Sequence, residues 1–84
     1  MTDKNFIPRS QRKLREAMDL FHDILMSRNW DRKLILSKRR DRELVDRRQI
    51  IAKRLRSEGY SYPLIAKVMN RDHSSIMHLC RKRD

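Results

Sequence analysis

The sequence predicts a small all-α domain of about five to six helices. Apolar residues recur at helical spacing along most of the chain, and no stretch shows the alternation that is typical of a half-buried β-strand. Only one glycine and two prolines occur in 84 residues, so few positions interrupt a helix. A chain of this length removes only about 60–65% of its unfolded surface from water. We therefore expect residues 1–84 to form a single domain of modest stability.

The net charge of +11 indicates a polyanionic partner. Residues 37–84 hold 14 basic and 6 acidic residues (+8), whereas residues 1–36 hold 8 basic and 5 acidic residues (+3). The excess of positive charge is therefore concentrated in the C-terminal part. A nucleic acid is the first candidate partner.

Several features exclude other protein classes. A single cysteine rules out an internal disulfide, and no apolar run approaches the roughly 18 residues of a membrane span. Features of a signal peptide are also absent. We expect a cytoplasmic, nucleoid-associated protein that makes no contact with a membrane.

An amphipathic helix is predicted over residues 8–28, after a frayed end at residues 1–7 that carries no cap and no periodicity. Its apolar stripe comprises Leu14, Ala17, Met18, Phe21, Ile24 and Leu25. We expect this stripe to pack onto the helices that follow. The alternative is a homodimer contact through this first helix, because Leu20, Met26 and Trp30 extend its apolar surface.

A short helix and a basic run come next. Asp31 is placed to cap a helix that carries Leu34, Ile35 and Leu36, and the run from Ser37 to Arg42 follows it. Such a run is often only a solvated face. Because this one lies between predicted helices, we favour contacts with phosphates.

The helix after the basic run is expected to begin near Asp46, since Asp46 and Gln49 have the spacing of a capping box. It is expected to end near Ser57, because Glu58-Gly59 is typical of a left-handed C-terminal stop. Its apolar side would comprise Val45, Ile50, Ile51, Ala52 and Leu55.

Residues 46–83 are predicted to contain a helix-turn-helix. Gly59, Ser61 and Pro63 introduce a short helix whose apolar residues are Ile65, Val68 and Met69, and Asn70-Arg71 form a tight turn. Asp72 is a good N-cap for a second helix that starts near His73. On that helix, inward positions are Ile76, Leu79 and Cys80, while outer or flanking positions are Ser74, Ser75, Met77, His78 and Arg81. Short polar side chains thus lead the helix, at the end where recognition helices meet base edges.

The run Arg-Asp-His-Ser-Ser-Ile-Met-His at residues 71–78 resembles the hallmark of the C-terminal DNA-binding domain (domain IV) of the bacterial replication initiator DnaA, a Trp-repressor-like helix-turn-helix. Two further blocks resemble the same family: Leu-Ser-Lys-Arg-Arg at residues 36–40, and Arg48-Gln49 ahead of Ser61, Pro63 and Ile65. The likeness covers roughly residues 17–83. Three blocks in the right order make the resemblance specific for the fold and for DNA binding.

The resemblance implies which residues contact DNA. Arg48 matches the family arginine that enters the minor groove, where a guanidinium suits the concentrated negative potential. The positions that match base-facing residues of the major groove are Asp72, His73, Ser74 and Ser75. Their chemistry agrees, because a carboxylate accepts from cytosine, and histidine and hydroxyls adapt to several bases. Asp72 is expected both to cap the helix and to face a base. Candidate phosphate contacts are Lys38, Arg39, Arg40, Ser61, Lys67, Arg71, Arg81 and Lys82.

Metal, cofactor and enzyme readings find little support. His73, His78 and Cys80 are fewer than the four ligands of structural zinc, and the chain has no CxxC pair. Cys80 is better read as a small core residue. The glycines of an ATPase phosphate loop are missing as well. We expect no cofactor and no enzymatic activity.

The sequence therefore favours a protein that binds double-stranded DNA sequence-specifically, as a transcriptional regulator or as a regulator of DNA replication that competes for initiator sites. One alternative is a sequence-indifferent binder of DNA or RNA. It is weaker because single-strand readers usually expose aromatic residues for stacking, and only five aromatic residues occur here. The other alternative is a module that docks a replication or transcription protein through its first helix.

Overall fold

The computed structural model describes residues 9–81, and within them the chain forms five α-helices and no strand. These are α1 (Arg9–Arg28), α2 (Arg32–Leu36), α3 (Arg42–Ser57), α4 (Tyr62–Met69) and α5 (His73–Arg81). The all-α class is confirmed. The frayed end expected at residues 1–7 lies outside the described residues.

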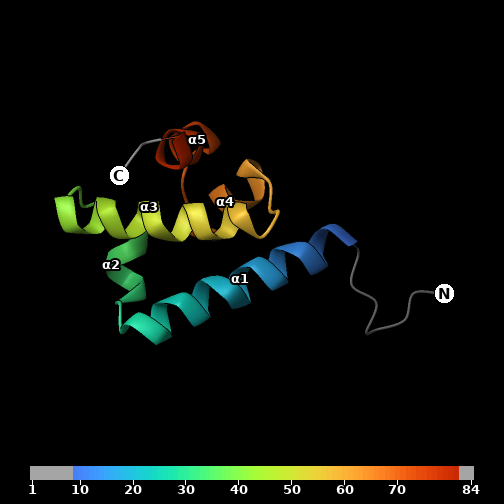
Figure 1. Ribbon diagram of the computed structural model, residues 1–84, viewed down its shortest axis with the longest axis horizontal. Coiled ribbons are helices and arrows are strands. Elements are labelled where there is room, and N and C mark those ends of the chain that lie inside the picture. The colour runs from blue at the N-terminus through green and yellow to red at the C-terminus, as the bar shows by residue number, and fades with distance from the viewer. Residues whose placement is uncertain (1–8, 82–84) are drawn as a thin grey trace.

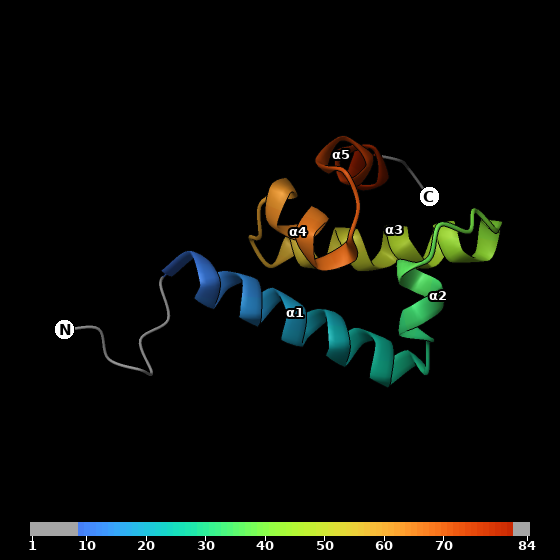
Figure 2. The same ribbon diagram turned by 180° about the vertical axis from the view of Figure 1, so that it is seen from behind.

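Helix α3 is the central element of the fold. It contacts α1, α2, α4 and α5, and α1 crosses the side of α3 opposite to α5 (Figures 1 and 2). The buried apolar residues are Ala17, Phe21, Leu25, Ile35, Leu44, Ile51, Ala52, Leu55, Ile65, Ala66, Val68, Met69 and Ile76. Every helix contributes to this list, so all five share one core.

Three helices end in the same way, with a residue in the left-handed conformation. Asn29 (φ 55°), Gly59 (φ 94°) and Asn70 (φ 53°) follow α1, α3 and α4. At each of these ends, the N–H group of the left-handed residue and that of the next residue donate to carbonyls of the last helical turn. For example, Arg71 N–H donates to Ala66 O at 2.9 Å. This is the Schellman arrangement, and it satisfies carbonyls that the helix leaves unpaired. The Asn70 turn thereby fixes how α5 leaves α4.

Side-chain caps start two of the helices, and the cap at Asp31 was expected. The Asp31 carboxylate accepts a hydrogen bond from Lys33 N–H at 2.8 Å at the start of α2. The Ser61 hydroxyl accepts one from Leu64 N–H at 3.4 Å at the start of α4, where Pro63 occupies the first turn.

The expected start of α3 near Asp46 is wrong. The helix begins at Arg42, one turn earlier, so Asp46 is an exposed residue within it and Gln49 is buried. The additional turn carries Leu44 into the core, where 5% of it remains exposed. Glu43 also forms an i,i+4 ion pair with Arg47. Burial of Leu44 stabilises this additional turn. The local Asp46–Gln49 pattern carries no information about such burial, so it predicted a later start.

The apolar stripe of α1 packs mainly onto its own chain. Ala17, Phe21 and Leu25 are in the core, whereas Met18 is 43% exposed and Met26 is 70% exposed. Trp30 is half-buried, and the guanidinium groups of Arg28 and Arg47 lie 5.1 and 5.2 Å from its ring centroid.

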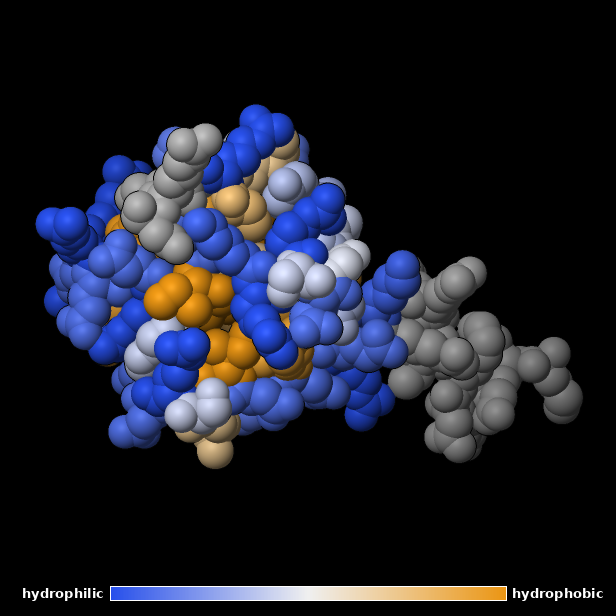
Figure 3. All heavy atoms as spheres, viewed as in Figure 1, coloured by the Kyte–Doolittle hydropathy of each residue, from blue (hydrophilic) through white to orange (hydrophobic). Residues whose placement is uncertain are grey.

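A shallow groove remains between α1 and α3, where Figure 3 shows apolar atoms gathered on a largely hydrophilic face. Its volume is about 420 Å³, and Leu20, Ile24 and Ile50 supply its apolar lining. Within residues 9–81, none of the helices combines the length and the apolar character needed to cross a membrane.

Candidate nucleic-acid interface

Helices α4 and α5, joined at Asn70 and Arg71, form the helix-turn-helix. Ile76 is fully buried and anchors α5 against α3 and α4, and Leu79 and Cys80 are half-buried beside it. The opposite face of α5 is exposed; it carries His73, Ser74, Ser75, His78 and Arg81. The helical spacing therefore placed the inner and outer faces of α5 correctly.

The four residues expected to face bases lie together at the start of α5. Asp72 occupies the N-cap position, since its carbonyl accepts a hydrogen bond from Ile76 N–H at 3.1 Å. Its side chain and those of His73, Ser74 and Ser75 are all exposed. Polar groups able to accept and to donate are thus displayed side by side at the N-terminal end of the helix.

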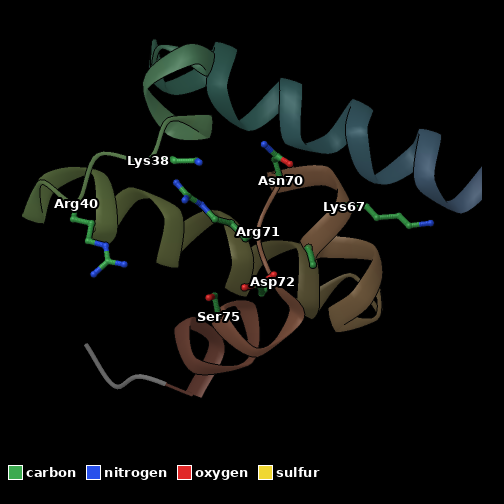
Figure 4. A pocket seen from close by; sticks show the side chains of 8 residues that line it. Lys38, Arg40, Lys67, Asn70, Arg71, Asp72 and Ser75 are labelled. Carbon is green, nitrogen blue, oxygen red and sulfur yellow. The ribbon is translucent and has the colours of Figure 1, made fainter.

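A groove of about 770 Å³ lies next to these residues (Figure 4). It is lined by Lys38, Arg40, Ala66, Lys67, Asn70, Arg71, Asp72 and Ser75. Its cationic side chains come from the loop between α2 and α3, from α4 and from the turn before α5. Residues far apart in the sequence therefore converge into one basic surface beside the start of α5.

A second groove, of about 450 Å³, adjoins the first. Arg40, Arg71 and Ser75 line both grooves, and the second also includes Val45, Arg48, Ser74, His78 and Leu79. The α2–α3 loop and the outer face of α5 thus form one continuous surface. His78 contributes to this surface.

The remaining candidate phosphate contacts lie around this surface. Arg39 is exposed and forms an ion pair with Asp41 at 2.7 Å, which offsets part of its charge. Ser61 is exposed at the start of α4, and Arg81 is exposed at the end of α5. Lys82 lies outside the described residues.

The structure places Arg48 largely inside the domain, where it contributes to the lining of the second groove. Only 5% of it is exposed. Its Nε donates to Ile35 O at 2.9 Å, its Nη1 to Arg39 O at 2.6 Å, and its Nη2 to Ser37 O at 2.8 Å and to Leu34 O at 3.2 Å. In this structure the guanidinium thus points into the protein and holds the α2–α3 loop, and the minor-groove contact implied by the resemblance stays a prediction.

The length of α2 explains the two bonds to Ile35 O and Leu34 O. A helix of five residues leaves most of its carbonyls without an intrahelical partner, and a guanidinium has five donors to offer. The spacing of residues along α3 could have predicted the burial of Arg48. Arg48 lies four residues after Leu44, three before Ile51 and seven before Leu55, so it shares their core-facing side of α3.

Arg71 reaches the same loop from the opposite side. Its Nη2 donates to Ser37 O and lies 3.5 Å from Ile35 O. Figure 4 shows its side chain extending from the α4–α5 turn toward the loop that carries Lys38. Burial lowers the pKa of the Arg48 guanidinium, and the neighbouring charge of Arg71 lowers it further, while Asp41 acts in the opposite direction. Arg48 nevertheless keeps its charge, as arginine does in proteins.

Tyr60 and Tyr62 have packing roles. The Arg56 guanidinium lies 4.5 Å from the centroid of the Tyr62 ring and donates to Tyr60 O at 3.0 Å. Burial raises the pKa of the Tyr60 hydroxyl, and Glu16, Glu58 and Asp19 raise it further. Burial likewise raises the pKa of the Cys80 thiol, against the lowering effect of Arg56 and Lys53. No cluster of three or more metal-ligating side chains occurs within residues 9–81.

Comparison with known proteins agrees with this geometry. Residues 24–82 match the family described as bacterial DnaA protein helix-turn-helix, a DNA-binding domain. The match spans α2 to α5, the α2–α3 loop and the residues that line both grooves. No curated protein and no solved structure matches the chain. Since the matched segment covers well over half of the sequence, the chain belongs to the bacterial DnaA helix-turn-helix family.

Proposed function

We propose that this protein binds double-stranded DNA sequence-specifically, with the N-terminal half of α5 in the major groove. The observation that carries the proposal is the display of Asp72, His73, Ser74 and Ser75 beside a basic groove. A carboxylate, an imidazole and two hydroxyls offer acceptors and donors suited to base edges. The fully buried Ile76 holds the helix that presents them.

The basic groove supplies the phosphate contacts that orient α5. Lys38, Arg40 and Lys67 line it from two sides, and Arg71 stands between them. Arg39, Ser61 and Arg81 add further contacts around it, and Lys82 extends the set. Contacts of this kind fix the register on the duplex and contribute affinity that falls with salt, but they carry little sequence information.

Binding a defined site suits two biological roles: control of transcription at an operator, and occupation of initiator sites in competition with a resident initiator. We rank transcriptional regulation first, because a short basic helix-turn-helix protein is the common form of a small repressor or activator. Both roles rest on the same DNA-binding surface.

Selection of bound duplexes from a random library at about 150 mM salt tests the proposal, because nonspecific phosphate contacts are partly suppressed there. A single asymmetric motif supports a monomeric reader and makes competition for initiator sites credible. A palindrome indicates a dimer, with α1 as the expected contact.

Selection without enrichment refutes sequence-specific binding. If the protein instead binds random duplex or single strands as tightly as it binds any selected duplex, it is a sequence-indifferent binder. A pull-down tests the remaining alternative. If the variant with His73 and Ser75 both replaced by alanine still captures a partner protein, and the selection enriches no duplex, the chain is a protein-interaction module.

A further inference from the structure

The groove between α1 and α3 shares no lining residue with the two grooves beside α5. Its apolar floor consists of Leu20 and Ile24, which are half-buried, and Ile50, which is 41% exposed. An apolar recess with charged side chains around it is typical of a contact surface. The groove therefore calls for a partner other than the DNA bound at α5.

The two edges of this groove carry opposite charges. Asp23 is exposed on the α1 edge and Arg54 is exposed on the α3 edge. Asp23 forms no ion pair with another residue of the described range 9–81. Arg54 lies 3.2 Å from Glu58, but these side chains are 58% and 44% exposed, and such a surface pair is weak. Both charges are thus available to a partner.

The α1 edge is acidic along much of its length. Residues 16–27 contain Glu16, Asp19 and Asp23 and no lysine or arginine, although the chain has a net charge of +11. Glu16, Leu20 and Asp23 follow one another at i, i+4 and i+7, so they share one side of the helix. An acidic side repels nucleic acids and anionic lipid surfaces. The occupant of the groove must therefore offer apolar surface together with positive charge.

A second copy of this chain meets both requirements. A two-fold axis along the groove places α1 of each copy over α3 of the other, because this rotation exchanges the two edges. Asp23 of one copy then faces Arg54 of the other, twice, and the apolar floors meet between these pairs. An interface of this kind requires a patch that is complementary to itself, and this patch is.

We propose that the groove between α1 and α3 is a homodimer interface, in which Leu20, Ile24 and Ile50 form the apolar centre and Asp23 pairs with Arg54 of the other copy. This proposal goes beyond DNA binding, since it concerns a separate surface. Both grooves beside α5 stay open in such a dimer, which therefore presents two DNA-binding surfaces.

Sedimentation equilibrium without DNA tests the dimer. Wild-type protein is measured from about 10 to 500 μM, because a small interface gives a weak dimer. Salt is kept at about 150 mM, where the repulsion between two copies of charge +11 is screened beyond about 8 Å. We expect the average mass to rise from that of one chain toward that of two.

Charge reversal tests the pairing. Asp23→Arg or Arg54→Glu alone places like charges opposite each other at two points of the dimer, and each should weaken dimerisation at least about 10-fold. An equimolar mixture of these two variants restores both complementary pairs, so the mixture should dimerise although neither variant does so alone. The Asp23→Arg/Arg54→Glu double variant should also dimerise. Rescue on mixing cannot arise from a contact within one chain.

Ile50→Glu and Met26→Glu test the apolar centre with matched substitutions. Ile50 lines the groove, whereas Met26 is 70% exposed on α1 and is not among the lining residues. Ile50→Glu should weaken dimerisation at least about 10-fold, because it places a charge in the centre of the interface, and Met26→Glu should weaken it less than about 2-fold. Circular dichroism and urea unfolding establish that each variant is folded.

A wild-type protein that stays monomeric at about 500 μM would overturn the proposal. So would charge-reversed variants that fail to associate on mixing, or equal effects of Ile50→Glu and Met26→Glu. A monomer that binds anionic lipid vesicles and loses this binding in Ile50→Glu would assign the groove to a membrane surface instead. None of these measurements includes a duplex, so their outcome is independent of the proposed DNA binding.

Discussion

Replacing Ser75 by alanine separates base reading from phosphate binding. Ser75 is exposed on α5 and lines both grooves, so its hydroxyl lies at the centre of the proposed interface. Ser75→Ala leaves the core untouched, and the unfolding free energy should change by no more than about 0.5 kcal/mol. Any large loss of binding then reflects the interface rather than the fold.

The expected cost on the preferred site is about 1–3 kcal/mol, or roughly 5- to 150-fold in affinity. A hydrogen bond from a neutral hydroxyl contributes only about 1 kcal/mol net, and the base group left without a partner in the closed interface accounts for the remainder. On random duplex the loss should be less than about 2-fold, because the phosphate contacts persist.

Lys67→Gln is the matched variant that tests phosphate binding in place of base reading. Lys67 is exposed on α4 and lines the basic groove. Its neutralisation should weaken binding to every sequence by about 5-fold at 150 mM salt and reduce the salt slope by about 0.9. Lys13→Gln removes the same charge from α1, a helix that contributes no residue to either groove beside α5, and should leave the slope almost unchanged.

Fluorescence anisotropy titrations with the selected duplex, its single-base variants and a random duplex measure all of these quantities. The assignment of Ser75 to base reading is refuted if Ser75→Ala weakens selected and random duplexes alike. The assignment of the groove to phosphates is refuted if Lys67→Gln affects one sequence only, or if Lys13→Gln reduces the slope equally.

Three further predictions concern the scaffold that carries α5. Ile76→Ala should lower the free energy of unfolding by about 2–5 kcal/mol and Ile76→Val by about 0.5–1.5 kcal/mol in urea titrations, because Ile76 is fully buried; a smaller loss for the alanine would show that α5 is loosely packed. Asn70→Ala should lower it by about 1–2 kcal/mol, whereas Asn70→Gly should not, since residue 70 has a φ of 53°; equal effects would contradict a left-handed turn. Burial raises the pKa of the Cys80 thiol and so favours the protonated form up to higher pH; alkylation at pH 8 should be slower than in urea-unfolded protein, and equal rates would disprove this burial.

Helix α5 was predictable from the sequence because its signals are local. The left-handed turn at Asn70, the N-cap position of Asp72 and the apolar spacing from Ile76 all lie within one short segment, and each is a property of a few neighbouring residues. The start of α3 was not predictable in this way. Its additional turn depends on burial of Leu44 against other helices, and the Asp46–Gln49 spacing offered a competing local pattern.

Arg48 shows why site residues are harder to assign than helices. Its partners are carbonyls 9 to 14 residues earlier in the chain, and they become available only because α2 ends after five residues and the loop folds back over α3. A resemblance at this position supplies the residue type but not the direction of its side chain. To enter a minor groove, the guanidinium would have to leave four carbonyls. Leu34 O also accepts from the Ser37 hydroxyl, and Ser37 O accepts from Arg71. The cost of about 1–3 kcal/mol for a buried carbonyl left without a donor therefore applies to Ile35 O and Arg39 O at most. In this structure the guanidinium holds the α2–α3 loop, and entry into a minor groove requires contacts with DNA that offset the loss of these hydrogen bonds.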